Sequence, residues 1–385
     1  MANISDTFNI NFICLKVFGV PWPGKTSSIY YKCYSSIYIL VSLILYYLLI
    51  ILNLFYTPRN IELLVREVLF CFSETVAAAK VVLIFLKRKT IVRAFRILNC
   101  TFFKGDDESQ ELVSKYIVKY KTYWKLNAIM SNSAFFAKIF VPIMSYIVYG
   151  KLELPIYNYY FLEKKTISRH FTFLWFYQAW GIYGHMMYNI NIDSFIAGLI
   201  LIIIAQIRII DHDLRMLKST SVDEEQLAKL NKCLRHYEMV LQFSKEVQSI
   251  ISVTMFIQFS VASGSICAIL CSLLFPTTFG ALMSMLLYMS PYAFVMILQI
   301  FVPAYLGTQL RYRSQDLVHA AYSSKWIARS ESFKRSLKLF MLRANTPIVF
   351  SGCGLFPLTL VTFTSIMKTA YSFFTVVRNV QRTEK

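Results

Sequence analysis

The chain has 385 residues; 56% of them are hydrophobic, 16% are charged, and the formal net charge is +19. A soluble domain carries about 25% charged residues, whereas here the apolar residues form blocks long enough to cross a bilayer, which takes about 20 residues. This composition excludes an ordinary soluble domain. The continuous runs exclude a β-barrel, whose strands alternate, and the cations flank the runs instead of forming a separate basic stripe for nucleic acid.

Taken in chain order, the apolar runs predict an all-α polytopic membrane protein with seven transmembrane helices. The residues before the first run contain no apolar core followed by a cleavage site, so we expect no removable signal peptide. The second run is the weakest, because it carries Glu74 and Lys80. The predicted spans are 30–55, 68–86, 127–150, 171–207, 250–275, 279–306 and 350–377.

Lysine and arginine predict the orientation of these spans. Segments 1–29, 87–126, 208–249 and 307–349 lie on one side and carry 27 of these cations, whereas the segments on the other side carry 9. Cation excess marks the cytosolic side of a membrane. We therefore expect a cytosolic N-terminus and, after seven spans, an extracellular C-terminus.

The eight cysteines are scattered and include no C-x-x-C pair. Most fall in spans or in segments expected in the cytosol, where disulfides are rare. The sequence therefore predicts neither a disulfide framework nor a zinc site, and nothing in it points to a cofactor or a bound metal.

Several helices are predicted to extend beyond the membrane. The fourth, 171–217, contains no proline, and its 47 residues would reach about 70 Å at 1.5 Å per residue. The fifth is preceded by a stretch of helical periodicity (224–250), the sixth continues past residue 306, and 331–344 is amphipathic before the seventh. These segments pack as a helical bundle or lie as interfacial helices on the membrane.

The last span has two different faces on a helical wheel. One arc of about 100° carries mainly small polar residues: Thr362, Ser365, Thr369, Ser372, Val376 and Asn379. The opposite side is bulky: Phe356, Leu360, Phe363, Met367, Tyr371 and Phe374. A polar stripe serves close helix packing or faces water, and we favour water because its one apolar member, Val376, lies near the mouth, where an apolar ring gates a pore by dewetting. A pore of this kind requires several subunits around an axis.

The chain resembles an insect odorant receptor from about residue 10 to its end. The resemblance rests on residues in order along the second half: "YQ" (177–178), Asp193, Gln206, "LNKCLRHYEMVLQFSKEVQSI" (230–250), "FIQFSVASGSIC" (256–267), "PAYLGTQL" (303–310), "AAYSSKWI" (320–327) and "IMKTAYSFFTVVRN" (366–379). The T-Y-apolar-Q-F ending that is typical of the related gustatory receptors is absent, since Val376 follows Thr375.

The resemblance implies a single domain over 1–385 that is a subunit of a tetrameric, odorant-gated, non-selective cation channel in olfactory neurons. It implies a cytosolic anchor from about 208–249 and 307–349, and a pore helix over 350–380. The short connection at 219–226 indicates a ligand-tuned subunit that assembles with the common co-receptor, which has a longer insertion there. By alignment, Val376 falls at the gate and Asn379 at the polar position beside it, with Ser372, Thr369 and Ser365 along the pore.

The resemblance also places a ligand in the outer half of the bundle, among the second, third, fourth and sixth spans. Candidates at that depth are Phe70, Ser73, Ala77, Phe140, Met144, Ile147, Tyr183, Met187, Tyr188, Met283 and Leu287, although residues at this spacing are commonly core packing. Among the ionisable residues at membrane depth (Glu74, Lys80, Lys138, Asp193 and Lys368), pairing or function is the default. We expect Glu74 to pair with Lys80 or Lys138, and His185 to be a hydrogen-bonded core residue.

Three other classes fit less well. A G-protein-coupled receptor would have the opposite orientation, and the sequence has neither D-R-Y after the third span nor N-P-x-x-Y in the last. A transporter would show an internal repeat or paired broken helices. An enzyme would bring a nucleophile or an acid–base pair to one depth, and the spans contain no such constellation.

Overall fold

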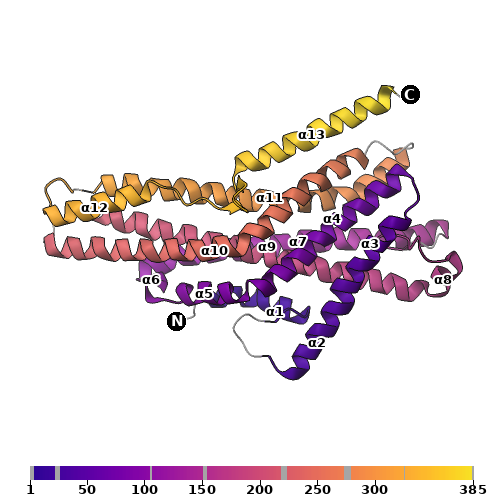
Figure 1. The fold of residues 1–385 in the computed structure, drawn as a ribbon, viewed down its shortest axis with the longest axis horizontal. Coiled ribbons are helices and arrows are strands. Elements are labelled where there is room, and N and C mark those ends of the chain that lie inside the picture. The colour runs from indigo at the N-terminus through magenta and orange to yellow at the C-terminus, as the bar shows by residue number, and fades with distance from the viewer. Residues whose placement is uncertain are drawn as a thin grey trace.

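The structure is a computed structural model of the chain, and it describes residues 4–21, 27–104, 106–150, 154–217, 223–272, 279–324 and 326–383. These residues are almost entirely helical (Figure 1). The elements are η1 (Ile4–Phe8), α1 (Asn9–Val17), α2 (Ile29–Ile39), η2 (Leu40–Leu45), α3 (Tyr46–Tyr56), α4 (Ile61–Leu86), α5 (Arg88–Leu98), α6 (Thr101–Lys104), α7 (Asp107–Tyr149), α8 (Lys164–Arg169), α9 (Phe171–Met216), α10 (Asp223–Ser272), α11 (Phe279–Tyr322), α12 (Glu331–Ala344), β1 (Ser351–Gly352), β2 (Phe356–Pro357) and α13 (Leu360–Thr383).

Seven helical segments of the described chain are long and apolar enough to cross a membrane, which confirms the predicted number of spans. They are Ile29–Tyr56, Leu63–Leu86, Glu108–Met144, Phe171–Met216, Asp223–Ser272, Met289–Tyr322 and Leu360–Asn379. The chain is therefore a multi-pass helical membrane protein. The first span is not a regular α-helix, because the π-helical turn η2 separates α2 from α3.

The centre of the fold is α9, which packs against α4, α7, α10 and α11. Its middle part is apolar on all sides, and a helix of that kind must be surrounded by other helices; residues 190–207 are buried throughout. The N-terminal helix α1 also reaches it. A Cβ atom on Gly198 would lie 2.6 Å from the ring of Phe8, so the missing side chain lets the N-terminal segment approach α9.

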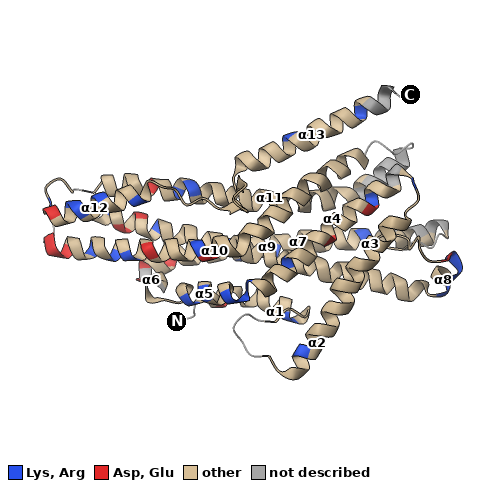
Figure 2. Ribbon diagram, viewed as in Figure 1, with Lys and Arg blue, Asp and Glu red and all other residues tan. Residues whose placement is uncertain are grey.

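Charged residues gather at one end of the molecule, where α5, α6 and α12 lie beside the ends of the long helices (Figure 2). We call residues 87–126, 208–249 and 307–349 the polar bundle. Its helices pack against one another: Phe333, Leu337 and Phe340 of α12 are buried, and the ring of Phe340 meets the edge of Tyr237 on α10 at 5.2 Å. The amphipathic faces thus have helical partners within the chain.

Two helices start ten or more residues away from the predicted position. The helix that contains the third span starts at Asp107, twenty residues before the expected 127, because this charged stretch hides an apolar face, and Val113 and Tyr120 are buried. The last span starts at Leu360 instead of residue 350. The residues before it form the β1–β2 hairpin, where Gly354 takes a φ of 72° that glycine adopts without steric cost.

Candidate functional site

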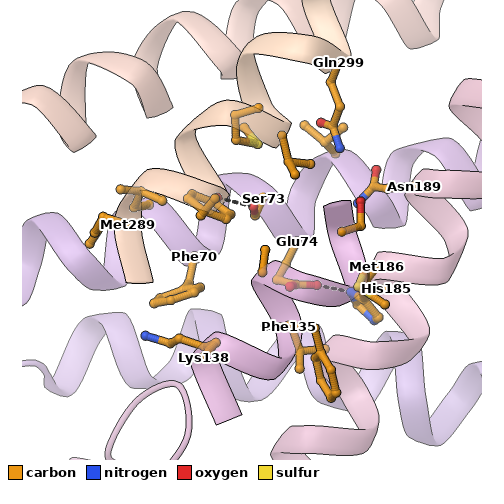
Figure 3. A pocket seen from close by; sticks show the side chains of 18 of the residues that line it. Phe70, Ser73, Glu74, Phe135, Lys138, His185, Met186, Asn189, Met289 and Gln299 are labelled. Atoms are coloured by element: carbon orange, nitrogen blue, oxygen red, sulfur yellow. Dashed lines mark hydrogen bonds and ion pairs between the residues drawn. The ribbon is translucent and has the colours of Figure 1, made fainter. Parts of the chain in front are cut away.

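A cavity opens among α4, α7, α9 and α11, and its volume is about 120 Å³ (Figure 3). An engineered apolar cavity of about 150 Å³ binds benzene, so this space fits a molecule of roughly one ring. The wall combines apolar and methionine side chains with hydroxyl, amide and charged groups. The lining residues are Arg66, Leu69, Phe70, Ser73, Glu74, Val76, Ser131, Ala134, Phe135, Lys138, Ile182, His185, Met186, Asn189, Met289, Tyr292, Val295, Met296 and Gln299.

A buried ion pair joins two helices at the wall. Glu74 on α4 contacts Nδ1 of His185 on α9, and both side chains are nearly inaccessible; Figure 3 shows them facing one another. The other ring nitrogen, Nε2, lies 2.8 Å from the carbonyl oxygen of Ser42. Ser42 belongs to η2, and a π-helical turn departs from the regular i to i−4 bonding. His185 therefore links α4 to the irregular turn of the first span.

A second pair lies about two turns further along α9. Lys80 Nζ is 2.6 Å from Asp193 Oδ1, with side chains 0% and 5% exposed, and 2.8 Å from Asn189 Oδ1. The expectation that Glu74 pairs with Lys80 or Lys138 is therefore wrong for the contacts that the structure describes. The partners come from α9, because that helix carries both His185 and Asp193 on the face toward α4.

Two contacts connect the cavity wall to α11 and α7. The hydroxyls of Ser73 and Tyr292 are 2.5 Å apart and join α4 to α11. Lys138 Nζ on α7 lies 4.8 Å from the centroid of the Phe70 ring, a favourable cation–π distance. The side chains that surround the cavity are thus tied to one another across four helices.

The predicted ligand residues divide into four groups. Phe70 and Ser73 line the cavity. Ala77 and Tyr188 are fully buried away from it, and Tyr183 and Met187 are half-buried away from it. A third group is exposed on the outer face of α7: Phe140, Met144 and Ile147. The side chains of Met283 and Leu287 lie outside the described residues.

Sequence reasoning missed most of the polar part of the wall. Lys138, Glu74 and His185 were noted for their charge or burial, but nothing along one helix shows which neighbour it faces. Asn189 and Tyr292 gave no signal, since single polar residues in long helices are common. Within the described residues no three His, Cys, Asp or Glu side chains converge as they would around a metal, and the eight cysteines are free thiols.

The last helix, α13, leaves the body of the protein, and its far end lies well apart from the other helices (Figure 1). Its inner side packs on α10 and α11, and Phe363 meets the ring of Phe301 at 5.4 Å. In the predicted stripe Thr362 is half-buried, and the other members are exposed: Ser365, Thr369, Ser372, Val376 and Asn379. Tyr371 belongs to the bulky side of the wheel, yet it is 61% exposed.

The fold and site together define a seven-helix membrane receptor with an internal ligand-sized cavity and one uncovered terminal helix. The model of the 7tm odorant receptor family matches residues 60–371. The chain belongs to this family, whose members are receptors and not enzymes.

Relatives and a solved structure agree with this assignment. Odorant receptor 10 of Aedes albopictus is 28% identical over 200 residues, which are 51% of this chain and 52% of that protein, so the match spans about half its length. Odorant receptor 2a of Drosophila melanogaster is 23% identical over 93% of both chains. The insect olfactory receptor OR5 from Machilis hrabei, solved in complex with eugenol, superposes with a TM-score of 0.85 at 16% identity over 98% of both chains.

Proposed function

We propose that this chain is the odorant-binding subunit of a ligand-gated, non-selective cation channel. It assembles with the common co-receptor as a hetero-oligomer, most simply a tetramer, in the plasma membrane of olfactory sensory neurons. The N-terminus and the polar bundle lie in the cytosol, where the bundle anchors the subunits, and the C-terminus lies outside. The excess of 27 cations over 9 on the two predicted sides supports this orientation.

The observation that carries the proposal is the uncovered polar stripe of α13. One subunit half-buries Phe363 and Met367 on the bulky side of this helix and leaves Ser365, Ser372 and Asn379 exposed. Hydroxyl and amide groups gain nothing from contact with lipid, whereas several copies arranged around an axis would place them on a shared water-filled path. Val376, 59% exposed on the same side, then narrows that path near its outer end.

The cavity supplies the ligand site of this channel. It lies among four helices, is largely apolar and has a few polar groups, as small-molecule sites do. The helix α11 lines the cavity through Tyr292 and Gln299 and also holds the start of α13, because Thr308 Oγ1 accepts a hydrogen bond from Leu360 N at 2.9 Å. One continuous helix therefore touches both the ligand site and the base of the pore helix.

Co-expression with an insect odorant co-receptor tests the proposal. Volatile ligands should evoke cation currents that neither chain gives alone, and an epitope tag after Lys385 should be labelled on intact cells. Currents that require a G protein, or a tag reached only after permeabilisation, would contradict the channel and its orientation.

A further inference from the structure

The amide of Asn189 has a fixed direction at the cavity wall. Its Oδ1 lies 2.8 Å from Lys80 Nζ, and an ammonium group only donates hydrogen bonds, so the oxygen of this amide must be the atom that faces Lys80. Lys80 is itself held by Asp193 at 2.6 Å, with both side chains buried. The oxygen and nitrogen of an amide are usually hard to tell apart, but the contact with the ammonium group of Lys80 identifies the oxygen here.

The Nδ2 group of Asn189 consequently points away from Lys80. Asn189 is half-buried and lines the cavity, and Figure 3 shows it on the wall formed by α9. In the described part of the chain Nδ2 makes no hydrogen bond, and it is not among the polar atoms enclosed by protein. An amide nitrogen only donates, so the wall presents a fixed donor to whatever occupies the cavity.

The other polar groups of the wall reinforce this bias. Arg66 and Lys138 can only donate, and Ser73 and Tyr292 already bond each other. Among the lining residues that the structure describes, Glu74 is the one carboxylate, and His185 contacts its Oε2, which leaves Oε1 as an acceptor. The side-chain amide of Gln299 adds one donor group and one acceptor. The wall therefore offers an entering molecule donors in excess of acceptors.

We propose that the cavity selects small carbonyl compounds, namely aldehydes, ketones or esters of about one ring in size, whose oxygen accepts a hydrogen bond from Asn189 Nδ2. A carbonyl oxygen has two lone pairs and no proton, so it satisfies the donor without leaving a hydroxyl or amine proton unpaired. This inference rests on the proposed role of the cavity as the odorant site.

Matched ligand pairs test the ligand class in cells that express this chain with an insect odorant co-receptor. Benzaldehyde and styrene share a shape but differ by an oxygen in place of a methylene group, as do cyclohexanone and methylenecyclohexane. The carbonyl member of each pair should be the more potent, by about three- to tenfold, since that is the range of one net hydrogen bond. Alkenes equal to their carbonyl partners would overturn the ligand class alone, and silence to every volatile would overturn the proposed function.

Variants of Asn189 assign the effect to this amide. Asn189→Leu keeps the number of side-chain heavy atoms but removes the donor, together with the oxygen that bonds Lys80, so it should bring the potency ratio of benzaldehyde to styrene close to one. Asn189→Asp replaces the donor by an acceptor and should favour benzyl alcohol over benzaldehyde. Met186→Leu changes an apolar lining residue, so it should change the potency of both ligands in a pair by the same factor. Surface labelling of each variant identifies folding failure; a surface-expressed Asn189→Leu that keeps the carbonyl preference would overturn the assignment.

Discussion

Gly307 of α11 lies directly against the backbone of Leu358, in the segment that leads into α13. A Cβ atom at residue 307 would be 2.1 Å from the carbonyl oxygen of Leu358, far inside van der Waals contact. The next residue of α11, Thr308, bonds the first amide of α13. The close approach of Gly307 and Leu358 therefore fixes where the last helix begins relative to the helix that lines the cavity.

Gly307→Ala should move the base of α13. In an isolated helix this change is stabilising by about 1 kcal/mol, but here the added methyl must displace a backbone carbonyl, so we expect altered gating despite the better helix former. The measurement is the resting and ligand-evoked current of the assembled channel at equal surface expression. Currents identical to those of the parent chain would show that this contact does not position α13.

The pair of Lys80 and Asp193 should behave as a coupled unit. Removal of one partner by Lys80→Met or Asp193→Leu leaves a buried charge uncompensated, which typically costs about 3–5 kcal/mol. The double variant Lys80→Met/Asp193→Leu removes both charges and should recover much of that loss. The measurement is the thermal stability of the detergent-solubilised parent chain, both single variants and the double variant. If the loss in the double variant equals the sum of the two single losses, the two side chains do not interact.

The sequence predicts the helices of this protein well because each span is a long apolar run, and a run of that length rarely forms anything other than a membrane-spanning helix. On α13 it predicts the exposure of Ser365, Thr369, Ser372, Val376 and Asn379, but not that of Tyr371 and Phe373, which are bulky and exposed as well. It fails at α7, where the apolar face of 107–126 is diluted by lysines, and at Glu74, whose partner His185 is distant in sequence. Contacts between helices depend on rotation and depth, which no single helix reveals.

The structure gives a role to Gln178, the second residue of the "YQ" pair at 177–178, which the sequence alone does not explain. It is fully buried on α9, where Oε1 accepts a hydrogen bond from Ile156 N at 3.2 Å and Nε2 donates to Tyr157 O at 2.8 Å. Tyr157 in turn packs in the same cluster as Phe70, which lines the cavity. Gln178 thus holds the segment after α7 in place beside the cavity.

Gln178→Leu should destabilise this segment, because it leaves two buried backbone groups unpaired at about 1–3 kcal/mol each. We expect reduced surface expression and weaker ligand responses. The matched control is Tyr177→Phe on the preceding residue, which removes only the hydroxyl that donates to Val41 O and should have a smaller effect. Equal effects of the two changes would contradict the role assigned to Gln178.

Adjacent valines on α13 provide a test of the gate with an internal control. Val376 is 59% exposed on the polar stripe, whereas Val377 is half-buried and lies off that stripe. Val376→Ala should raise the resting current or change ion permeation. The shorter side chain widens the apolar constriction, and a wider constriction dewets less readily.

Val377→Ala makes the same chemical change one residue later, off the polar stripe, and should leave permeation unchanged. Whole-cell currents with different permeant cations, recorded with the co-receptor, separate the two effects. If Val377→Ala alters permeation and Val376→Ala does not, the pore is lined by the other side of α13, and the rotation of this helix in the assembled channel differs from that in the single subunit.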